Sequence, residues 1–209
     1  DTSSRLLNSV VKDSPFILGG SADLFAANRT YIKDAGDFSS SNYLGKNIFF
    51  GVREHAMGAI LNGLALSGFR VYGSTFLSFS DYMKPAIRMA AMMKLPVIYI
   101  FTHDSIGVGE DGPTHEPIEQ LAALRSLPNF TVFRPCDKVE TSAAWMYAAT
   151  SKETPTALVL TRQNLPQMPG SSKEALKGGY IIDDSSKAVP DAIIIASGSE
   201  VSLAVEAKA

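Results

Sequence analysis

The chain has 209 residues, of which 45% are apolar and 19% are charged, and its formal net charge is −2. This composition is ordinary for a globular protein, and without a basic run neither nucleic acid nor an anionic membrane is an expected partner. The longest apolar stretch, at 95–101, is too short to span a bilayer. The single cysteine, Cys136, excludes an internal disulfide and is typical of a reducing compartment. We therefore expect a soluble, cytoplasmic protein.

Six short apolar runs recur along the chain and predict β-strands. Each run is largely apolar on both faces, which is typical of strands in a parallel sheet that helices cover on both sides. In chain order the runs lie at 16–20, 47–52, 70–76, 96–103, 130–135 and 156–161.

Helical patterns lie between these runs. The clearest begins at Glu54, has apolar residues at helical spacing and ends at Gly68. The expected helices lie at 54–68, 76–93, 117–126 and 139–151. The alternation of strands and helices predicts an α/β fold with a doubly wound, mainly parallel sheet and helices on both faces.

Two irregular stretches interrupt this alternation. Residues 22–46 form a long polar connection, and connections of this length are often functional or mobile. A second irregular stretch suggests a linker, so we expect a main domain at 1–165 and a linker at 166–190. Residues 191–209 then have the pattern of a strand, a Gly-Ser turn and a helix. This unit cannot bury its own apolar faces, so we expect it to be the truncated start of another domain.

The segment at 103–117, HDSIGVGEDGPTHEP, gathers acids, histidines, glycines and prolines. Its GVGEDG stretch matches the G-x-G-x-x-G pattern of dinucleotide-binding loops, in which a helix opens at the glycines. Here Pro113 and Pro117 prevent a helix from starting at that point. Glu110 and Asp111 also put negative charge where a pyrophosphate would lie. These features argue against a dinucleotide site.

Three other interpretations of this segment stay open from the residues alone. His103, Asp104, Asp111 and His115 are suitable metal ligands, but their spacing matches no standard zinc or calcium pattern. A solvated surface loop is the second possibility. The third is an active-site loop. It is favoured because the segment follows the expected carboxyl end of a strand, where open parallel sheets bind ligands.

Several other candidate residues also allow a purely structural explanation. Ser21 lies in a stretch, GGSAD, that fits a turn and a helix cap. Glu54 lies in the first turn of a helix, where an acid complements the helix dipole. Phe76, Phe79 and Tyr82 recur at every third position, and an aromatic stripe of this kind more often belongs to the core than to a pocket.

Two arginines are candidates for binding an anion. Arg5 and Arg162 would both ordinarily be exposed cations. Arg162 lies just past the end of an expected strand, at the same edge of the sheet as the 103–117 segment. A guanidinium there is suited to a phosphate or carboxylate, which it binds with charge-assisted hydrogen bonds.

Taken together, these motifs resemble one family. In chain order they are GGSAD, GVREHAMGAILNG, GSTFLSFSDY, THDSIGVGEDGPTHEP, RSLPN and LTRQNLP. The set is similar to transketolase over essentially the whole chain. Deoxyxylulose-phosphate synthase and the pyruvate dehydrogenase β subunit share the fold and the glutamate, but the 103–117 segment resembles transketolase much more closely.

The resemblance implies a thiamine diphosphate-binding fold and a place in a longer chain of three α/β domains. This sequence resembles the middle, pyrimidine-binding domain and the start of the C-terminal domain. The cofactor would then lie between the middle domain and the pyrophosphate-binding domain of the other subunit in a homodimer. The Mg²⁺ or Ca²⁺ site belongs to that pyrophosphate-binding domain, so we assign no metal ligand in this chain. The segment alone is expected to be inactive.

The resemblance also implies which residues serve the cofactor. Glu54 would hydrogen-bond the 1′ nitrogen of the aminopyrimidine and favour its imino tautomer, which then deprotonates the thiazolium carbon. Phe79 would stack on the pyrimidine ring, with Phe76 and Tyr82 completing an apolar pocket. A dry pocket of this kind strengthens the hydrogen bond of the glutamate.

The implied reaction is transfer of a two-carbon ketol unit from a ketose phosphate to an aldose phosphate, a step of the pentose phosphate pathway. Asp111 would contact the sugar hydroxyl next to the carbonyl, and His103 and His115 would contact other substrate oxygens. The terminal phosphate would be held by Arg5, Ser21 and Arg162. Two alternatives stay open: another thiamine diphosphate enzyme, and a non-catalytic subunit that completes the site of a partner.

Overall fold

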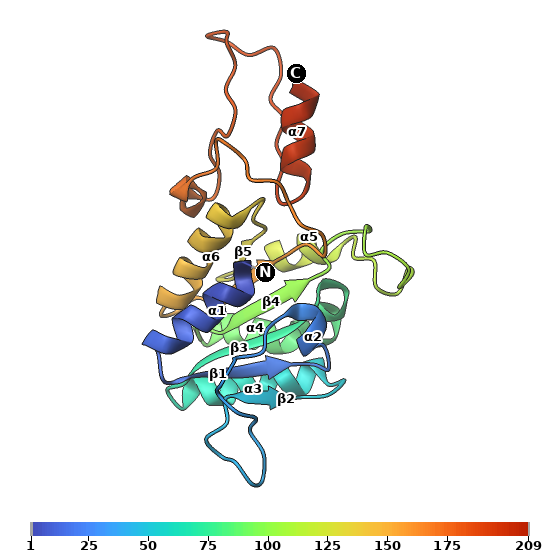
Figure 1. The fold of residues 1–209 in the computed structure, drawn as a ribbon. Coiled ribbons are helices and arrows are strands. Elements are labelled where there is room, and N and C mark those ends of the chain that lie inside the picture. Colours follow the sequence, from blue (N-terminus) through green and yellow to red (C-terminus); the bar gives the residue numbers. More distant parts are fainter. Residues whose placement is uncertain (1, 209) are drawn as a thin grey trace.

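A single parallel sheet determines the architecture of the protein. The computed structural model describes residues 2–208, and its six strands are all parallel, in the order β2-β1-β3-β4-β6-β5 (Figure 1). The strands are β1 (Ile17–Ser21), β2 (Asn47–Phe49), β3 (Arg70–Phe76), β4 (Ile98–Thr102), β5 (Thr131–Phe133) and β6 (Thr156–Val159). Each overlaps one of the six expected ranges, so the predicted sheet is confirmed.

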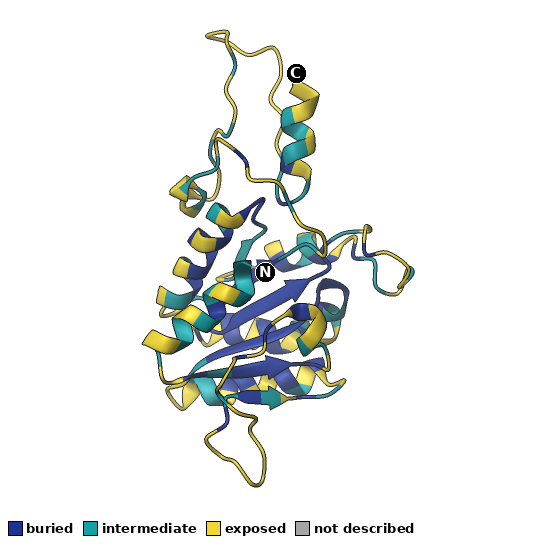
Figure 2. Ribbon diagram, in the orientation of Figure 1, coloured by how far each residue is buried: buried dark blue, intermediate teal, exposed yellow. Residues whose placement is uncertain are grey.

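Helices cover both faces of the sheet. One face carries α1 (Thr2–Asp13) and α6 (Lys138–Thr150), and the other carries α3 (Glu54–Leu66), α4 (Lys84–Met92) and α5 (Gln120–Arg125). Two apolar cores result, one containing Tyr72 and Trp145 and the other containing Met57 and Phe101. The central strands are therefore buried on both sides (Figure 2), which explains why their sequences do not alternate. None of the described helices is both long and apolar enough to cross a bilayer.

Helix α1 is not among the helices expected from the sequence. Its residues Leu6, Leu7, Val10 and Val11 belong to the core that α1 shares with α6. Spacing of i, i+1, i+4 and i+5 puts these side chains on one face of a helix, so the signal for α1 is present in the sequence.

The expected helix at 76–93 is divided into two elements. Phe76 ends β3, a 3₁₀-helix, η1 (Leu77–Met83), follows it, and α4 then begins with a proline in its first turn. Proline suits this place because the first N–H groups of a helix have no partner within it. In a 3₁₀-helix three residues complete one turn, so side chains at i and i+3 lie above one another. This geometry aligns Phe79 with Tyr82, whereas Phe76 precedes the 3₁₀-helix with an extended backbone at the end of β3.

The polar connection at 22–46 contains a short helix and is held by a buried amide. Asn47 Oδ1 accepts a hydrogen bond from Ile32 N at 2.8 Å, and Asn47 Nδ2 donates to Ile32 O at 2.9 Å. The short helix α2 (Phe25–Asn28) ends where Arg29 adopts a left-handed backbone with φ of 54°. Helix α2 places the side chain of Asn28 at the buried carboxyl edge of the sheet, where it contacts Thr102.

The C-terminal segment differs from the expectation at one point. It contains the 3₁₀-helix η2 (Lys173–Lys177) and the helix α7 (Glu200–Lys208), but the strand predicted within 191–209 is not formed. Ile193 and Ile195 are 79% and 93% exposed. A strand needs a neighbouring backbone for its N–H and C=O groups, and no strand in residues 2–208 pairs with this run. The domain boundaries at 165 and 190 stay a prediction.

Candidate active site

Predicted site residues gather at the carboxyl edge of the sheet. β1 ends at Ser21 and β3 at Phe76, His103 directly follows β4, and Arg162 lies shortly after β6. Because the strands are parallel, these ends meet at one edge, and the segment between β4 and α5 projects from it (Figure 1). Open parallel sheets bind their ligands at this edge.

An aromatic stack joins the end of β3 to two histidines. The rings of Phe76 and His103 are stacked, with centroids 3.8 Å apart, and Phe79 lies parallel to Phe76 at 6.0 Å. His115 presents its ring edge-on to Phe79 at 5.0 Å, and Tyr82 lies 6.2 Å from Phe79. The structure therefore brings together five residues predicted separately from the sequence.

The aromatic stripe of Phe76, Phe79 and Tyr82 runs from the interior to the surface. The interpretation of the stripe as part of the core therefore applies to Phe76 alone. Phe76 is 6% exposed and belongs to the interior, whereas Tyr82 is 65% exposed. Phe79 lies between them and is half-buried. A planar ligand can therefore reach the outer part of the stripe.

His103 is held in an unusual environment. It is buried, and its backbone is left-handed, with φ of 60°. Residues other than glycine adopt this conformation at some cost, and such strain concentrates at functional sites. Burial lowers the pKa of His103, the positive charges of Arg162 and His115 lower it further, and the charge of Asp111 opposes them. At neutral pH the imidazole is therefore uncharged.

Two exposed charged residues act on this histidine from the loop and from the end of β6. Asp111 and Arg162 are exposed, and both act on the charge of His103. A Cβ atom added to Gly109 would lie 3.8 Å from Arg162 Cζ, so the arginine lies against the loop. His115 N donates a hydrogen bond to Gly112 O at 3.0 Å, which closes the turn that carries its ring.

Glu54 begins α3 at the same edge. It is 8% exposed, and no group in residues 2–208 donates a hydrogen bond to its carboxylate. The helix lies close to the sheet because β3 has a glycine beneath it. A Cβ at Gly73 would lie 2.5 Å from Leu61 Cδ1. The carboxylate oxygens are not sealed from solvent, so they are open to a hydrogen-bond donor from a ligand at this edge.

Of the predicted phosphate-binding residues, Ser21 lies at this edge but is engaged in hydrogen bonds, and Arg5 lies elsewhere. Ser21 is buried, and its hydroxyl contacts Asn28 Oδ1 at 3.0 Å and Ser74 O at 3.1 Å. It would reach a phosphate only after giving up one of these bonds. Arg5 is exposed on α1 and belongs to a separate hollow of about 240 Å³, together with Lys12 and Lys33. Their predicted phosphate contacts stay predictions.

The loop between β4 and α5 has no helix at its glycines. Residues 103–119 are irregular, and α5 begins only at Gln120, after both prolines. A dinucleotide loop requires a helix at that point, so the structure supports the argument against a dinucleotide site. Within residues 2–208, no three His, Cys, Asp or Glu side chains are grouped closely enough to hold a metal ion.

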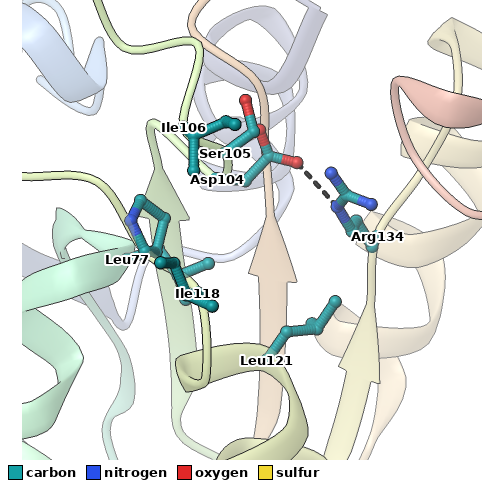
Figure 3. Close-up of a pocket in the computed structure, with 8 residues that line it drawn as sticks. Leu77, Asp104, Ser105, Ile106, Ile118, Leu121 and Arg134 are labelled. Carbon is teal, nitrogen blue, oxygen red and sulfur yellow. Dashed lines mark hydrogen bonds and ion pairs between the residues drawn. The ribbon is translucent and has the colours of Figure 1, made fainter.

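A hollow of about 260 Å³ at the base of the loop was not expected from the sequence. Figure 3 shows its lining: Leu77, Asp104, Ser105, Ile106, Pro117, Ile118, Leu121 and Arg134. Arg134 Nε donates to Asp104 Oδ2 at 2.8 Å, and both side chains are buried. Arg134 Nη2 also donates to Glu200 Oε1 at 3.1 Å. One guanidinium thus links the sheet to the C-terminal helix.

Burial and charge act against each other in this ion pair. Burial raises the pKa of Asp104, against the opposing charge of Arg134. Burial alone would lower the pKa of Arg134, but its hydrogen bond to Glu200 and the charge of Asp104 outweigh this effect. The sequence offered no signal for the pair, because Asp104 and Arg134 lie at the ends of different strands.

Comparison with known proteins identifies the family. Residues 1–168 match the family model of the transketolase pyrimidine-binding domain. The chain belongs to the transketolase family. The Bacillus subtilis transketolase is 60% identical over 213 residues, which cover 100% of this chain and 32% of that relative. The Geobacillus stearothermophilus transketolase is 53% identical over 212 residues, 99% of this chain and 32% of that relative.

This transketolase-family chain also matches solved structures. A Pichia stipitis transketolase in complex with sedoheptulose 7-phosphate has a TM-score of 0.94 and 51% identity, covering 99% of this chain and 31% of that one. A structure described as "Split gene transketolase, inactive beta4 tetramer" has a TM-score of 0.62 and 26% identity, covering 83% and 53%. The chain therefore spans about a third of the length of its curated transketolase relatives.

Proposed function

We propose that this chain forms the pyrimidine-binding half of a transketolase active site within a longer polypeptide. The reaction is the thiamine diphosphate-dependent transfer of a two-carbon ketol unit from a ketose phosphate to an aldose phosphate, in the pentose phosphate pathway. The observation that carries the proposal is the position of Glu54, which is 8% exposed at the start of α3, with no side-chain hydrogen-bond partner in residues 2–208 and at the same sheet edge as the aromatic stack. The family match over residues 1–168 supports it.

The residues at the sheet edge fit an aminopyrimidine ring. The carboxylate of Glu54 accepts hydrogen bonds, and a protonated ring nitrogen is a suitable donor. Phe79 is half-buried against Phe76, which leaves ring surface for stacking by a planar ligand. When bound, thiamine diphosphate supplies the carbon nucleophile of the transfer. The part of Glu54 is to hold a proton at the ring nitrogen, and that of Phe76, Phe79 and Tyr82 is to stack and exclude water.

The loop side of the same edge fits a sugar phosphate. His103 and His115 offer ring nitrogens, and Asp111 offers a carboxylate that accepts hydrogen bonds from hydroxyl groups. Arg162 lies beside them as an exposed cation for a terminal phosphate. Related structures support this substrate class, since Pichia stipitis transketolase has been solved with sedoheptulose 7-phosphate and with xylulose 5-phosphate.

In this proposal the remaining half of the site comes from another subunit. The enzyme is a cytoplasmic homodimer, and the pyrophosphate-binding domain of the second subunit holds the diphosphate and its Mg²⁺ or Ca²⁺ ion. Arg5 and Ser21 complete the predicted phosphate contacts.

A second candidate is a subunit of a split transketolase that is inactive until its partner binds. The related structure described as "Split gene transketolase, inactive beta4 tetramer" favours this possibility. Both candidates use the same residues at the sheet edge. They differ in whether the pyrophosphate-binding domain is part of the same polypeptide.

The proposal is tested by comparing the 209-residue chain with a complete transketolase polypeptide that contains it. We expect the complete enzyme, supplied with thiamine diphosphate and Mg²⁺, to transfer a ketol unit from xylulose 5-phosphate and to reject pyruvate as donor. The chain alone should show no turnover. Turnover by the chain alone would contradict the half-site, and preference for pyruvate would contradict the transketolase assignment. Activity of the chain only after a separate partner is added would favour the split subunit.

A further inference from the structure

A buried chain of hydrogen bonds lies behind His103. It starts at Ser21, whose Oγ donates to Asn28 Oδ1 at 3.0 Å. Asn28 Nδ2 then donates to Thr102 Oγ1 at 2.7 Å. Thr102 Oγ1 in turn lies 2.9 Å from His103 Nδ1. All four residues are buried, so no bulk water competes for these groups.

The bonds of Ser21 and Asn28 give this chain of hydrogen bonds its direction. Ser21 Oγ accepts a hydrogen bond from Leu24 N at 3.1 Å, and its own hydrogen is shared between two oxygens, Asn28 Oδ1 and Ser74 O. Asn28 presents its oxygen to Ser21 and its NH₂ group to Thr102. An amide NH₂ group only donates hydrogen bonds.

The direction of these hydrogen bonds determines which imidazole nitrogen of His103 accepts. A threonine hydroxyl has one hydrogen, and Thr102 Oγ1 already accepts a bond from Asn28 Nδ2. The oxygen has a second lone pair and would also be able to accept from an Nδ1–H, but the threonine hydrogen would then be buried without an acceptor, because no other side-chain contact of this hydroxyl exists in residues 2–208. His103 Nδ1 is therefore the acceptor. In a neutral imidazole one nitrogen carries the proton, so the proton lies on Nε2.

We propose that Asn28 and Thr102 are positioning residues that hold His103 in the neutral tautomer with its proton on Nε2. The far nitrogen of the ring is then a hydrogen-bond donor at the sheet edge. For its catalytic consequence this inference rests on the proposed function, in which that donor meets an oxygen of the sugar.

Two further observations explain why the tautomer needs to be fixed. Burial keeps His103 neutral, so either nitrogen would be able to carry its single proton. The ring is also locked in place by its stack on Phe76 at 3.8 Å. With the ring held in this plane, the hydrogen bond behind it decides which nitrogen carries the proton.

The same inference explains the short helix α2. Asp23 and Arg29, on either side of it, both have left-handed backbones, with φ of 64° and 54°. These turns let the four-residue helix leave β1 and direct Asn28 to the end of β4, across the intervening β3. Part of the long polar connection thereby gains a function at the site.

His115 provides an internal control. Thr114 Oγ1 lies 2.8 Å from His115 Nδ1, which repeats the pairing of Thr102 with His103. This second pair is exposed, and no amide in residues 2–208 donates to Thr114. The hydroxyl of Thr114 is therefore free to donate or to accept, and the ring is not confined to one tautomer.

The test is a ¹⁵N NMR spectrum of the histidine side chains in the 209-residue chain, above the pKa of each ring. We expect wild-type His103 to carry its proton on Nε2. In Asn28→Asp the new side chain only accepts, so Thr102 donates to it and Nδ1 of His103 becomes protonated. Thr102→Ser should retain the Nε2 tautomer, Thr102→Val should allow both, and His115 should not respond.

A wild-type His103 with its proton on Nδ1 overturns the proposal, whether or not any variant folds. So does a folded Asn28→Asp chain whose Nδ1 stays unprotonated. In the complete enzyme, Asn28→Asp should lower kcat/KM for xylulose 5-phosphate about tenfold, while Thr102→Ser stays close to wild type. An unchanged kcat/KM with a switched tautomer removes the catalytic consequence. A complete enzyme without transfer activity contradicts only the proposed function, because the wild-type tautomer is read without turnover.

Discussion

The inner and outer sides of the candidate site are held by the fold in different ways. On the inner side, Phe76 and His103 are buried, stacked and tied to a hydrogen-bond chain. On the outer side, Asp111 and Arg162 lie on the exposed face of an irregular loop. The inner side is therefore preorganised, whereas the outer side is free to adjust around a ligand.

This contrast leads to different expectations for substitutions. An inner side chain contributes to packing as well as to the site, so its loss should lower both stability and activity. An outer side chain has few protein contacts, so its loss should change binding and leave the fold intact. The predictions below test that difference, in order of decreasing effect on stability.

The largest effect is expected at Phe76. Replacing it by alanine removes a buried ring and leaves a cavity against His103, so the free energy of unfolding should fall by about 3–5 kcal/mol. Tyr82→Ala is the matched control, because that ring belongs to the same stripe but is 65% exposed. Urea unfolding followed by circular dichroism measures both. Equal losses for the two variants would contradict the inner–outer distinction.

The next effect is expected at Arg134, at the base of the loop. Arg134→Met leaves Asp104 buried without its ion-pair partner. The free energy of unfolding should therefore be lower than that of the wild type by about 3 kcal/mol at pH 7, a deficit in stability. Burial raises the folded-state pKa of Asp104, so the folded state takes up a proton more readily than the unfolded chain. The deficit should therefore shrink as the pH falls toward about 4. Urea unfolding across this range checks it, and a pH-independent deficit would rule out Asp104 as its source.

A smaller effect on stability, but a clear one on binding, is expected at Arg162. In the complete enzyme, Arg162→Leu should raise KM for xylulose 5-phosphate about tenfold or more, because a charge-assisted hydrogen bond is lost. The free energy of unfolding should change by less than about 0.5 kcal/mol. The pKa of His103 should rise, since the positive charge of Arg162 lowers it. An NMR titration of the 209-residue chain measures that shift, and a fall in pKa would contradict the arrangement.

The smallest effect is expected at Asp111. Asp111→Asn keeps the shape of the side chain and removes a negative charge that raises the pKa of His103, so that pKa should fall. Stability should again change by less than about 0.5 kcal/mol, because the residue is exposed. The same titration serves as the measurement. Glu153→Gln is the control, because Glu153 is exposed and pairs with Lys94 rather than with a residue of the site. A rise in pKa would show that Asp111 does not face His103.

The sheet and most of its helices were predictable because their signals are local. Buried parallel strands leave continuous apolar runs, and the helix at Glu54 has helical spacing and a glycine stop. The strand predicted within 191–209 was wrong for a related reason. Its run of isoleucines has strand propensity, but a strand forms only beside another strand, and no local pattern supplies one.

The site was predictable residue by residue but not as an arrangement. Asn28 and Thr102 are 74 residues apart in the sequence and meet only because β1, β3 and β4 are neighbours in the sheet. The pair of Asp104 and Arg134 depends in the same way on strand order. Motif spacing identifies residues along the chain, whereas hydrogen-bond partners across the sheet follow from topology.

Glu54 offers the most direct test of the site at the sheet edge. In a complete transketolase containing this chain, Glu54→Gln keeps the size of the side chain and removes its charge. We expect turnover of xylulose 5-phosphate to fall about 100-fold or more, with the unfolding temperature nearly unchanged. The exposed Glu153→Gln should retain full activity. Turnover close to wild type in Glu54→Gln would contradict the assignment of this edge as the pyrimidine-binding half of the active site.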